Sequence, residues 1–185
     1  MVTVEPTILP DVKLIRTRAF TDSRGYFVET YNRQAFAAAG IADEFVQDNL
    51  SVSTQAGTIR GLHFQIAPFA QTKLVRVGHG RILDIAVDLR RSSRTYGRHV
   101  AIELSGEDGL QLLVPIGFAH GFCTLEPNTE VSYKVTAHYS AAHDRGVAWD
   151  DPALGIDWPV EPGQAILSEK DTRNPRLADL PAFFP

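Results

Sequence analysis

The stretch that decides the fold reads Val114-Pro115-Ile116-Gly117-Phe118-Ala119-His120-Gly121-Phe122. Pro115 and Gly117 favour a tight turn, because proline fixes its φ angle and glycine accepts backbone conformations that other residues avoid. This turn would deliver His120 to the start of the following strand. The sequence therefore predicts a turn, a strand and a titratable side chain in close succession.

Short segments that alternate apolar and polar residues extend on both sides of this stretch. Such alternation is typical of half-buried antiparallel strands. Helical patterning is confined to residues 33–39 and to a short turn after Ser168. The sequence predicts a mainly β protein with a jelly-roll β-barrel, closed or nearly closed so that few strand edges stay uncovered. The expected strands are residues 12–18, 26–31, 46–53, 57–65, 72–79, 81–89, 98–104, 111–114, 120–125 and 129–138.

Residues 1–185 are expected to form a single domain, since a chain of this length with 44% hydrophobic residues can bury one sizeable core. Beyond residue 150 the alternation fades and prolines become frequent, as in Asp151-Pro152 and Trp158-Pro159. We expect residues 150–185 to form an extended tail packed on the barrel.

Composition argues against several classes of protein. The net charge of −4 comes from 18 Lys and Arg against 22 Asp and Glu and leaves no basic stripe for nucleic acid. No apolar run is long enough to span a membrane, and the first residues lack the pattern of a secretory signal. Cys123 is the one cysteine and cannot form an intrachain disulfide. We expect a cytoplasmic protein that binds neither nucleic acid nor membrane.

Two side chains in neighbouring strands are the first candidates for chemistry. His63 lies beside a glycine in Arg60-Gly61-Leu62-His63-Phe64-Gln65, where another group can approach closely. Lys73 begins the next strand, and a cation near the histidine would stabilise negative charge on a bound substrate. Taken singly, such a histidine is more often a hydrogen-bonded core residue, and Lys73 a solvated edge charge.

Tyr133 and Asp171 are further candidates. Tyr133 shares a strand face with Val131 and Val135, and it presents a phenol to the cavity if that face lines the barrel interior. Without context a buried tyrosine is usually a packing residue. Asp171 could orient His63 through a ring nitrogen, or it could cap the following helical turn.

The Pro-x-Gly-x-x-His spacing at residues 115–120 resembles the second motif of the cupin superfamily, which consists of small jelly-roll barrels. Metal-binding cupins carry a paired His-x-His and a downstream Glu in their first motif. Here the matching residues are His63-Phe64-Gln65. Two histidines without a further suitable ligand do not readily make a metal site. The sequence therefore predicts no metal.

The chain as a whole resembles the dTDP-4-dehydrorhamnose 3,5-epimerase family of bacterial deoxysugar biosynthesis. The resemblance implies a cofactor-free and metal-free isomerase acting on dTDP-4-dehydro-6-deoxyglucose, a dTDP-4-keto-6-deoxy sugar, with dTDP-4-dehydrorhamnose as the product. The motifs that carry it are residues 22–29, 47–49, 60–65, 73–77, 84–90, 115–122 and 167–171.

The resemblance also implies a role for each catalytic candidate. His63 would be the base that removes the protons beside the ketone, and Asp171 would hold its tautomer. Lys73 would face the C4 oxygen, where enolate charge develops. Tyr133 would return a proton from the opposite face of the sugar. The implied catalytic residues are thus His63, Tyr133, Asp171 and Lys73.

The resemblance also implies which residues bind the substrate. Arg60 and His120 would contact the diphosphate or the sugar, and Tyr139 would stack on thymine. The N-terminal strands of two subunits exchange in this family, so the resemblance implies a homodimer in which Arg24 and Glu29 serve the partner's site. The alternative for these two is a pair of solvated charges. The expected binding residues are Arg24, Phe27, Glu29, Gln47, Asn49, Arg60, His120, Tyr139, Asp144 and Lys170.

Two positions depart from this expectation. Asp144 stands where the family usually has Glu, so its side chain is shorter. Strict alternation would send Arg60 and His63 to opposite faces of one strand, unless a bend or bulge at Gly61 reconciles them. Two other functions remain open: a relative that inverts only C3 or only C5 of another dTDP-4-keto-deoxysugar, and a non-catalytic or metal-dependent cupin.

Overall fold

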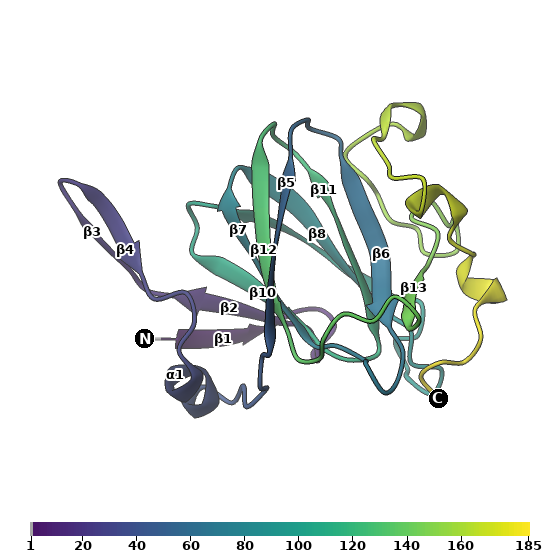
Figure 1. The fold of residues 1–185 in the computed structure, drawn as a ribbon, viewed down its shortest axis with the longest axis horizontal. Helices are drawn as coiled ribbons and strands as arrows, with labels where there is room; N and C mark the ends of the chain where they lie inside the picture. The colour runs from purple at the N-terminus through teal and green to yellow at the C-terminus, as the bar shows by residue number, and fades with distance from the viewer. Residues whose placement is uncertain (1) are drawn as a thin grey trace.

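The computed structural model describes residues 2–185, which form two facing β-sheets, a projecting hairpin and a C-terminal tail (Figure 1). The six-stranded sheet consists, in spatial order, of β1 (Val2–Pro6), β2 (Lys13–Thr17), β10 (Leu110–Val114), β7 (Lys73–His79), β12 (Thr129–Val135) and β5 (Gln47–Ser53). The five-stranded sheet consists of β13 (Asp144–Gly146), β6 (Ile59–Gln65), β11 (Phe118–Thr124), β8 (Arg81–Asp88) and β9 (His99–Ser105).

The main core lies between these two sheets. Val75 and Leu112 from the six-stranded sheet pack against Ile82 and Phe122 from the five-stranded sheet, all at most 3% exposed. The predicted mainly β jelly roll is confirmed. No strand ladder joins the two sheets anywhere in residues 2–185, so the barrel is a two-sheet sandwich rather than a closed ring.

Helix α1 (Arg33–Ala38) covers the outer face of the six-stranded sheet. The side chain of Asn32 caps its N-terminus by accepting hydrogen bonds from two backbone N–H groups. Phe36 is 1% exposed and packs against Leu74 and Ile15 of the sheet. In the described chain no helix has the length and apolarity needed to cross a bilayer.

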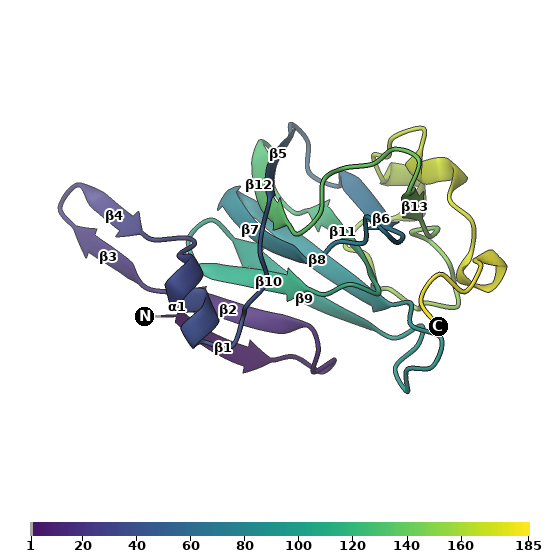
Figure 2. The same ribbon diagram turned by 60° about the horizontal axis from the view of Figure 1, so that its bottom comes forward.

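A hairpin of β3 (Ala19–Asp22) and β4 (Gly25–Val28), called the arm below, projects from the sandwich (Figures 1 and 2). Its apolar side chains are exposed: Phe20 to 53%, Tyr26 to 55% and Phe27 to 70%. The expected strand at 26–31 is therefore wrong in its extent and its setting, because it ends at Val28 and pairs only with β3. The strands β1, β3 and β13 were not expected at all.

After β13 the chain runs over the outer face of the five-stranded sheet without forming another strand. Short 3-10 helices interrupt this tail at Pro162–Gln164, Asp171–Arg173 and Leu177–Asp179. Leu154 and Leu177 of the tail pack against Leu62 and Phe64 of β6. This packing places Asp171 beside β6, 108 residues after its partner His63 in the sequence.

Candidate active site

A bulge in β6 solves the conflict between Arg60 and His63. His63 lies opposite His120 of β11, whereas Arg60 lies opposite Phe122, so two residues of β6 face the single residue Gly121. The extra residue brings Arg60 and His63 to the same inner face. Gly61, at the bulge, has a φ of +150°, and a Cβ there would lie 2.5 Å from the Cα of Gly121. The bulge therefore requires glycine.

The inner faces of the two sheets enclose a cavity of about 450 Å³, called the main cavity below. Arg60, His63 and His120 reach it from the five-stranded sheet. Lys73 and Tyr133 reach it from the six-stranded sheet, so they stand on the opposite wall. Asp171 of the tail completes the set of six site residues that the sequence predicted for this place.

His63 and Asp171 form a close pair, with 2.5 Å between Nε2 of the ring and Oδ1 of the carboxylate. Asp171 is 3% exposed. Burial alone would raise the pKa of Asp171, but hydrogen bonds and the neighbouring charge of His63, with further bonds from Ser168 and the backbone of Gly61, hold it below its usual value. The carboxylate is thus ionised and fixes one ring nitrogen of His63.

Lys73 is buried at the base of the cavity with 8% of its surface exposed. Its Nζ donates a hydrogen bond to the backbone oxygen of His63 at 3.2 Å. Burial lowers the pKa of Lys73 to about 8, although the charges of Asp144 and Asp84 oppose this effect and that of Lys170 adds to it. Lys73 therefore presents a cation to the cavity at neutral pH, close to the point at which it loses its proton.

Tyr133 stands across the cavity from the histidine. It belongs to β12, where Val131 and Val135 share its inward face as the alternation predicted. Burial raises the pKa of the Tyr133 phenol, so this group keeps its proton at neutral pH. A protonated phenol and an imidazole on opposite walls can give and take protons on the two faces of one bound molecule.

Asp84 is a site residue to which the sequence reasoning gave no role. Its Oδ1 lies 2.7 Å from Nε2 of His120, and its side chain is completely buried. Oδ2 is also buried and accepts no hydrogen bond from any residue between 2 and 185. The signal in the sequence was a carboxylate in the middle of β8, on the same face as Ala86 and flanked by the apolar residues Leu83 and Ile85.

A second cavity of about 270 Å³ adjoins the first and shares His63, Lys73 and Tyr133 with it. Its other walls carry predicted binding residues, namely Gln47, Asn49, Tyr139 and Asp144. Tyr139 is 60% exposed and donates a hydrogen bond from its hydroxyl to Oδ2 of Asp144 at 3.3 Å. Lys170 forms an ion pair with the same carboxylate oxygen. Asp144 thus joins the loop that carries Tyr139 to the C-terminal tail.

The arm residues are not brought to these cavities within one protomer. Arg24 is 87% exposed at its side chain and pairs with its neighbour Asp22 at 2.5 Å. Phe27 is 70% exposed on the same hairpin, and Glu29 follows directly after β4. Of the residues described, none from the arm lines either cavity.

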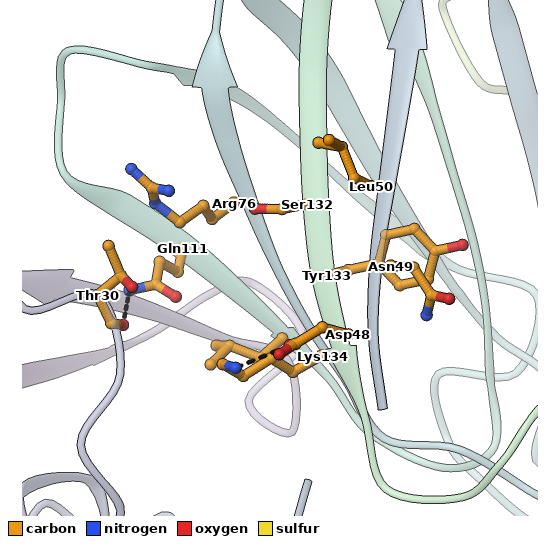
Figure 3. Close-up of a pocket in the computed structure, with 10 residues that line it drawn as sticks. Thr30, Asp48, Asn49, Leu50, Arg76, Gln111, Ser132, Tyr133 and Lys134 are labelled. Atoms are coloured by element: carbon orange, nitrogen blue, oxygen red, sulfur yellow. Dashed lines mark hydrogen bonds and ion pairs between the residues drawn. The ribbon is translucent and has the colours of Figure 1, made fainter. Parts of the chain in front are cut away.

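A third pocket of about 370 Å³, called the outer pocket below, lies on the six-stranded sheet beside the arm's attachment (Figure 3). In it Gln111 donates to the backbone oxygen of Thr30 at 2.7 Å, and Lys134 pairs with Asp48 at 2.7 Å. Tyr133 extends away from this group towards the inner side of the sheet (Figure 3). Of the catalytic candidates, Tyr133 alone also lines the outer pocket in the described chain, whereas His63, Lys73 and Asp171 line the main cavity.

The histidines do not form part of a multidentate metal site. Across residues 2–185 no group of three or more His, Cys, Asp or Glu side chains is placed to hold a metal ion. Each of the two histidines instead has a carboxylate partner, Asp171 for His63 and Asp84 for His120. The arrangement suits proton transfer next to a group that develops negative charge.

Comparison with known proteins assigns this geometry to a family. The sequence model of the dTDP-4-dehydrorhamnose 3,5-epimerase family matches residues 6–179. The dTDP-4-dehydrorhamnose 3,5-epimerase of Sinorhizobium fredii is 56% identical over 177 residues, covering 95% of this chain and 90% of the relative.

Two solved structures share the fold. The Bacillus anthracis epimerase with TDP and PPi bound is 51% identical, has a TM-score of 0.92 and matches 95% of this chain and 99% of its own. The dTDP-6-deoxy-D-glucose-3,5-epimerase of Legionella pneumophila, in complex with dTDP-4-keto-L-rhamnose, is 38% identical with a TM-score of 0.94, over 100% of this chain and 98% of its own. The chain belongs to the dTDP-4-dehydrorhamnose 3,5-epimerase family.

Proposed function

We propose that this protein epimerises C3 and C5 of dTDP-4-dehydro-6-deoxy-D-glucose and yields dTDP-4-dehydro-L-rhamnose. The observation that carries the proposal is the main cavity, in which the Asp171–His63 pair faces Lys73 and Tyr133. Membership of the family supports the choice of substrate.

His63 is the general base in this proposal. The ketone at C4 acidifies the protons on both neighbouring carbons, and the free nitrogen of His63 accepts each of them in turn. The buried carboxylate of Asp171 stabilises the imidazolium that results. The ammonium of Lys73 lies near the carbonyl group of His63 and supplies positive charge for the enolate oxygen.

Tyr133 is the acid that completes each inversion. Inversion needs a proton from the face opposite the base, and Tyr133 comes from the opposite sheet. Its raised pKa keeps the proton available at neutral pH. After each inversion the phenolate takes a proton from solvent and the imidazolium of His63 returns one to solvent, so both groups are reset before the second carbon reacts.

The substrate as a whole, sugar and nucleotide, occupies the two cavities together. Arg60 and His120 supply positive or hydrogen-bonding groups for the diphosphate, and both line the main cavity. The exposed ring of Tyr139 stacks on thymine at the second cavity. The remaining contacts in this proposal come from Gln47, Asn49, Asp144 and Lys170.

The functional unit in this proposal is a homodimer. Within one protomer Arg24, Phe27 and Glu29 lie on or next to the arm, far in the fold from the catalytic residues, so a second copy supplies them. The exposed Phe20 and Phe27 of the arm and the exposed Leu50 on the outer face of β5 support this assembly, because a partner would bury them. The lone thiol, Cys123, is fully buried, and a reducing cytoplasm is the compartment that we propose.

Proton exchange with the solvent tests the proposed reaction directly. In deuterated water the enzyme should incorporate deuterium at C3 and C5 of dTDP-4-dehydro-6-deoxy-D-glucose, followed by NMR, and the product should have both centres inverted. Exchange and inversion at one carbon alone would favour the single-site epimerase. Binding without any exchange would favour a non-catalytic cupin and would refute the proposal.

A further inference from the structure

The loop between β12 and β13 carries Tyr139, and glutamine side chains hold its backbone. Nε2 of Gln71 donates to the backbone oxygen of Ala137 at 2.7 Å. Nε2 of Gln65 donates to the backbone oxygen of His138 at 3.2 Å. Both bonds restrain the segment just before Tyr139.

Two further hydrogen bonds hold the next two residues of the loop, Tyr139 and Ser140. Oε1 of Gln47 accepts a hydrogen bond from the backbone nitrogen of Tyr139 at 3.0 Å. Oε1 of Gln65 accepts one from the backbone nitrogen of Ser140 at 2.6 Å. Each residue from 137 to 140 therefore has one backbone group bonded to a glutamine amide. We call Gln47, Gln65 and Gln71 the glutamine cradle.

The three glutamines come from different parts of the fold. Gln47 begins β5, Gln65 ends β6, and Gln71 lies just before β7, so the cradle spans both sheets. Gln65 is 4% exposed and also donates to the backbone oxygen of Phe69 at 2.8 Å. It thereby ties the loop before β7 to the loop of Tyr139. An amide suits this position because it offers donors and an acceptor without charge.

The cradle fixes the backbone around Tyr139, while the side chain of Tyr139 stays exposed. The loop from 137 to 140 lies outside the strands, so its peptide groups need partners other than a β-ladder. The ring of Tyr139 remains 60% exposed at the second cavity, and its hydroxyl donates a hydrogen bond to Asp144. A rigid backbone below an exposed aromatic ring reduces the entropy lost when a planar ligand stacks on it.

We propose that the glutamine cradle positions Tyr139 for the base of the nucleotide, so that Gln65 and Gln71 are positioning residues that set nucleotide affinity without taking part in proton transfer. This inference rests on the proposed function, in which Tyr139 stacks on thymine. Gln65 and Gln71 also line the second cavity, so the tests below separate an effect exerted through the ring of Tyr139 from direct contact with the nucleotide.

The test uses Gln65→Leu, which removes the three hydrogen bonds of Gln65 and introduces an apolar side chain of similar size. The Kd for dTDP, measured by calorimetry, and the KM for the sugar substrate should both rise about 3- to 10-fold, as expected when a contact must be ordered on binding. The kcat should stay within about 2-fold of the wild type, since the amide of Gln65 bonds to backbone groups of Phe69, His138 and Ser140 and not to the reacting side chains. Gln71→Ala, which removes only the bond to Ala137, should shift Kd and KM in the same direction by less.

A double-mutant cycle shows whether Gln65 acts through Tyr139. In a Tyr139→Ala background, Gln65→Leu should change the Kd by less than about 2-fold, because the ring that it positions is gone. The matched control is Thr129→Val, which removes a bond of the same kind, from a buried hydroxyl to the backbone oxygen of Glu126, at the other end of β12. This control should leave Kd and KM unchanged.

The possible outcomes distinguish a failure of the cradle proposal from a failure of the proposed reaction. If the wild type binds dTDP and the Kd is unchanged in both Gln65→Leu and Gln71→Ala, the cradle proposal is overturned. The proposed epimerase function is then unaffected. Effects of Gln65→Leu that are equal with and without Tyr139 also overturn it. If Gln65→Leu does not fold, the milder Gln71→Ala carries the same cycle. Wild-type protein that neither binds dTDP nor exchanges protons refutes both proposals.

Discussion

Tyr133, Lys73 and Asp171 meet in the main cavity, and the protonation state of each suits a different task. Burial raises the pKa of Tyr133, so the phenol holds a proton that it can give. Burial lowers the pKa of Lys73 to about 8, so its ammonium persists at neutral pH with a small margin. Asp171 holds one nitrogen of His63 and leaves the ring ready to accept a proton.

Replacing the acid should separate proton exchange from inversion. In Tyr133→Phe the base is intact, so deuterium should still enter the substrate from the face of His63 while inversion falls by about 10²–10⁴-fold. In His63→Ala both exchange and inversion should be lost. NMR in deuterated water measures both rates in one sample. Equal losses of the two in Tyr133→Phe would mean that the phenol also helps to form the enolate, and undiminished inversion would remove it from the mechanism.

At alkaline pH, the profile of kcat/KM should reflect the loss of the proton from Lys73. Because the pKa of Lys73 is lowered to about 8, the ammonium is lost as the pH rises through that value, and kcat/KM should fall there. The phenol of Tyr133 titrates at higher pH, since burial raises its pKa above the usual value of a tyrosine. Lys73→Arg keeps a cation at every accessible pH, so its profile should lack this limb even if its rate is lower. A limb near pH 8 that survives in Lys73→Arg would contradict the assignment.

At the scale of single elements, the bulge in β6 decides which side chains share the cavity. A regular strand would place Arg60 and His63 on opposite faces, and the extra residue between them removes that conflict. Gly61 permits the bulge through its positive φ and its close approach to Gly121. One glycine therefore controls the position of two functional groups.

Substituting this glycine should damage both folding and activity. In Gly61→Ala the new Cβ would lie 2.5 Å from a backbone atom of Gly121, in a backbone conformation that alanine rarely adopts. We expect the free energy of unfolding to fall by about 2 kcal/mol or more, with epimerase activity reduced further than stability alone explains. Gly163→Ala is the control, because nothing lies within 4 Å of a Cβ there and its φ is ordinary. Equal stability of the two variants in urea unfolding would show that β6 accommodates alanine.

Alternation predicted most strands of the sandwich, such as β5 and β12. The prediction missed β1, although Val2 and Val4 alternate with polar residues there. It failed for β3, whose four residues are all exposed, and for β13, which has three residues and begins with two polar ones. The predicted catalytic residues do meet in the main cavity, but their roles came from the resemblance to the family rather than from any local pattern, and they stay predictions. The Asp84–His120 pair and the bonds of the glutamine cradle depend on which strands and loops become neighbours, and no local pattern encodes that.

At the scale of the whole molecule, the site combines a rigid centre with two extensions. The sandwich supplies His63, Lys73 and Tyr133, and the tail delivers Asp171 over the outer face of the five-stranded sheet. The arm extends in the other direction (Figure 1). Its apolar side chains are exposed. A second copy that buries the arm and receives Arg24 and Glu29 would make two incomplete sites complete.

Mixed dimers should reveal whether the arm serves the partner's site. One variant carries Arg24→Ala with Glu29→Ala, and the other carries His63→Ala, so each alone should be inactive or nearly so. In a heterodimer, the arm of the His63→Ala subunit is intact and reaches the intact His63 of the other subunit. If subunits exchange at random, half of the dimers regain one of two sites, and activity should recover to about a quarter of the wild type.

The contrary arrangement predicts a different result with the same proteins. If each arm served its own subunit, the site with an intact His63 would still lack Arg24 and Glu29, and mixing would restore nothing. Subunit exchange is checked independently with differently tagged copies, so that absence of recovery can be read as evidence against the shared site. Mixing His63→Ala with Tyr133→Phe supplies the control: both residues line the same cavity of one protomer, so a heterodimer would contain one defect in each site and should not recover. Recovery in the first mixture but not in the second would locate the arm, and only the arm, in the neighbouring subunit's site.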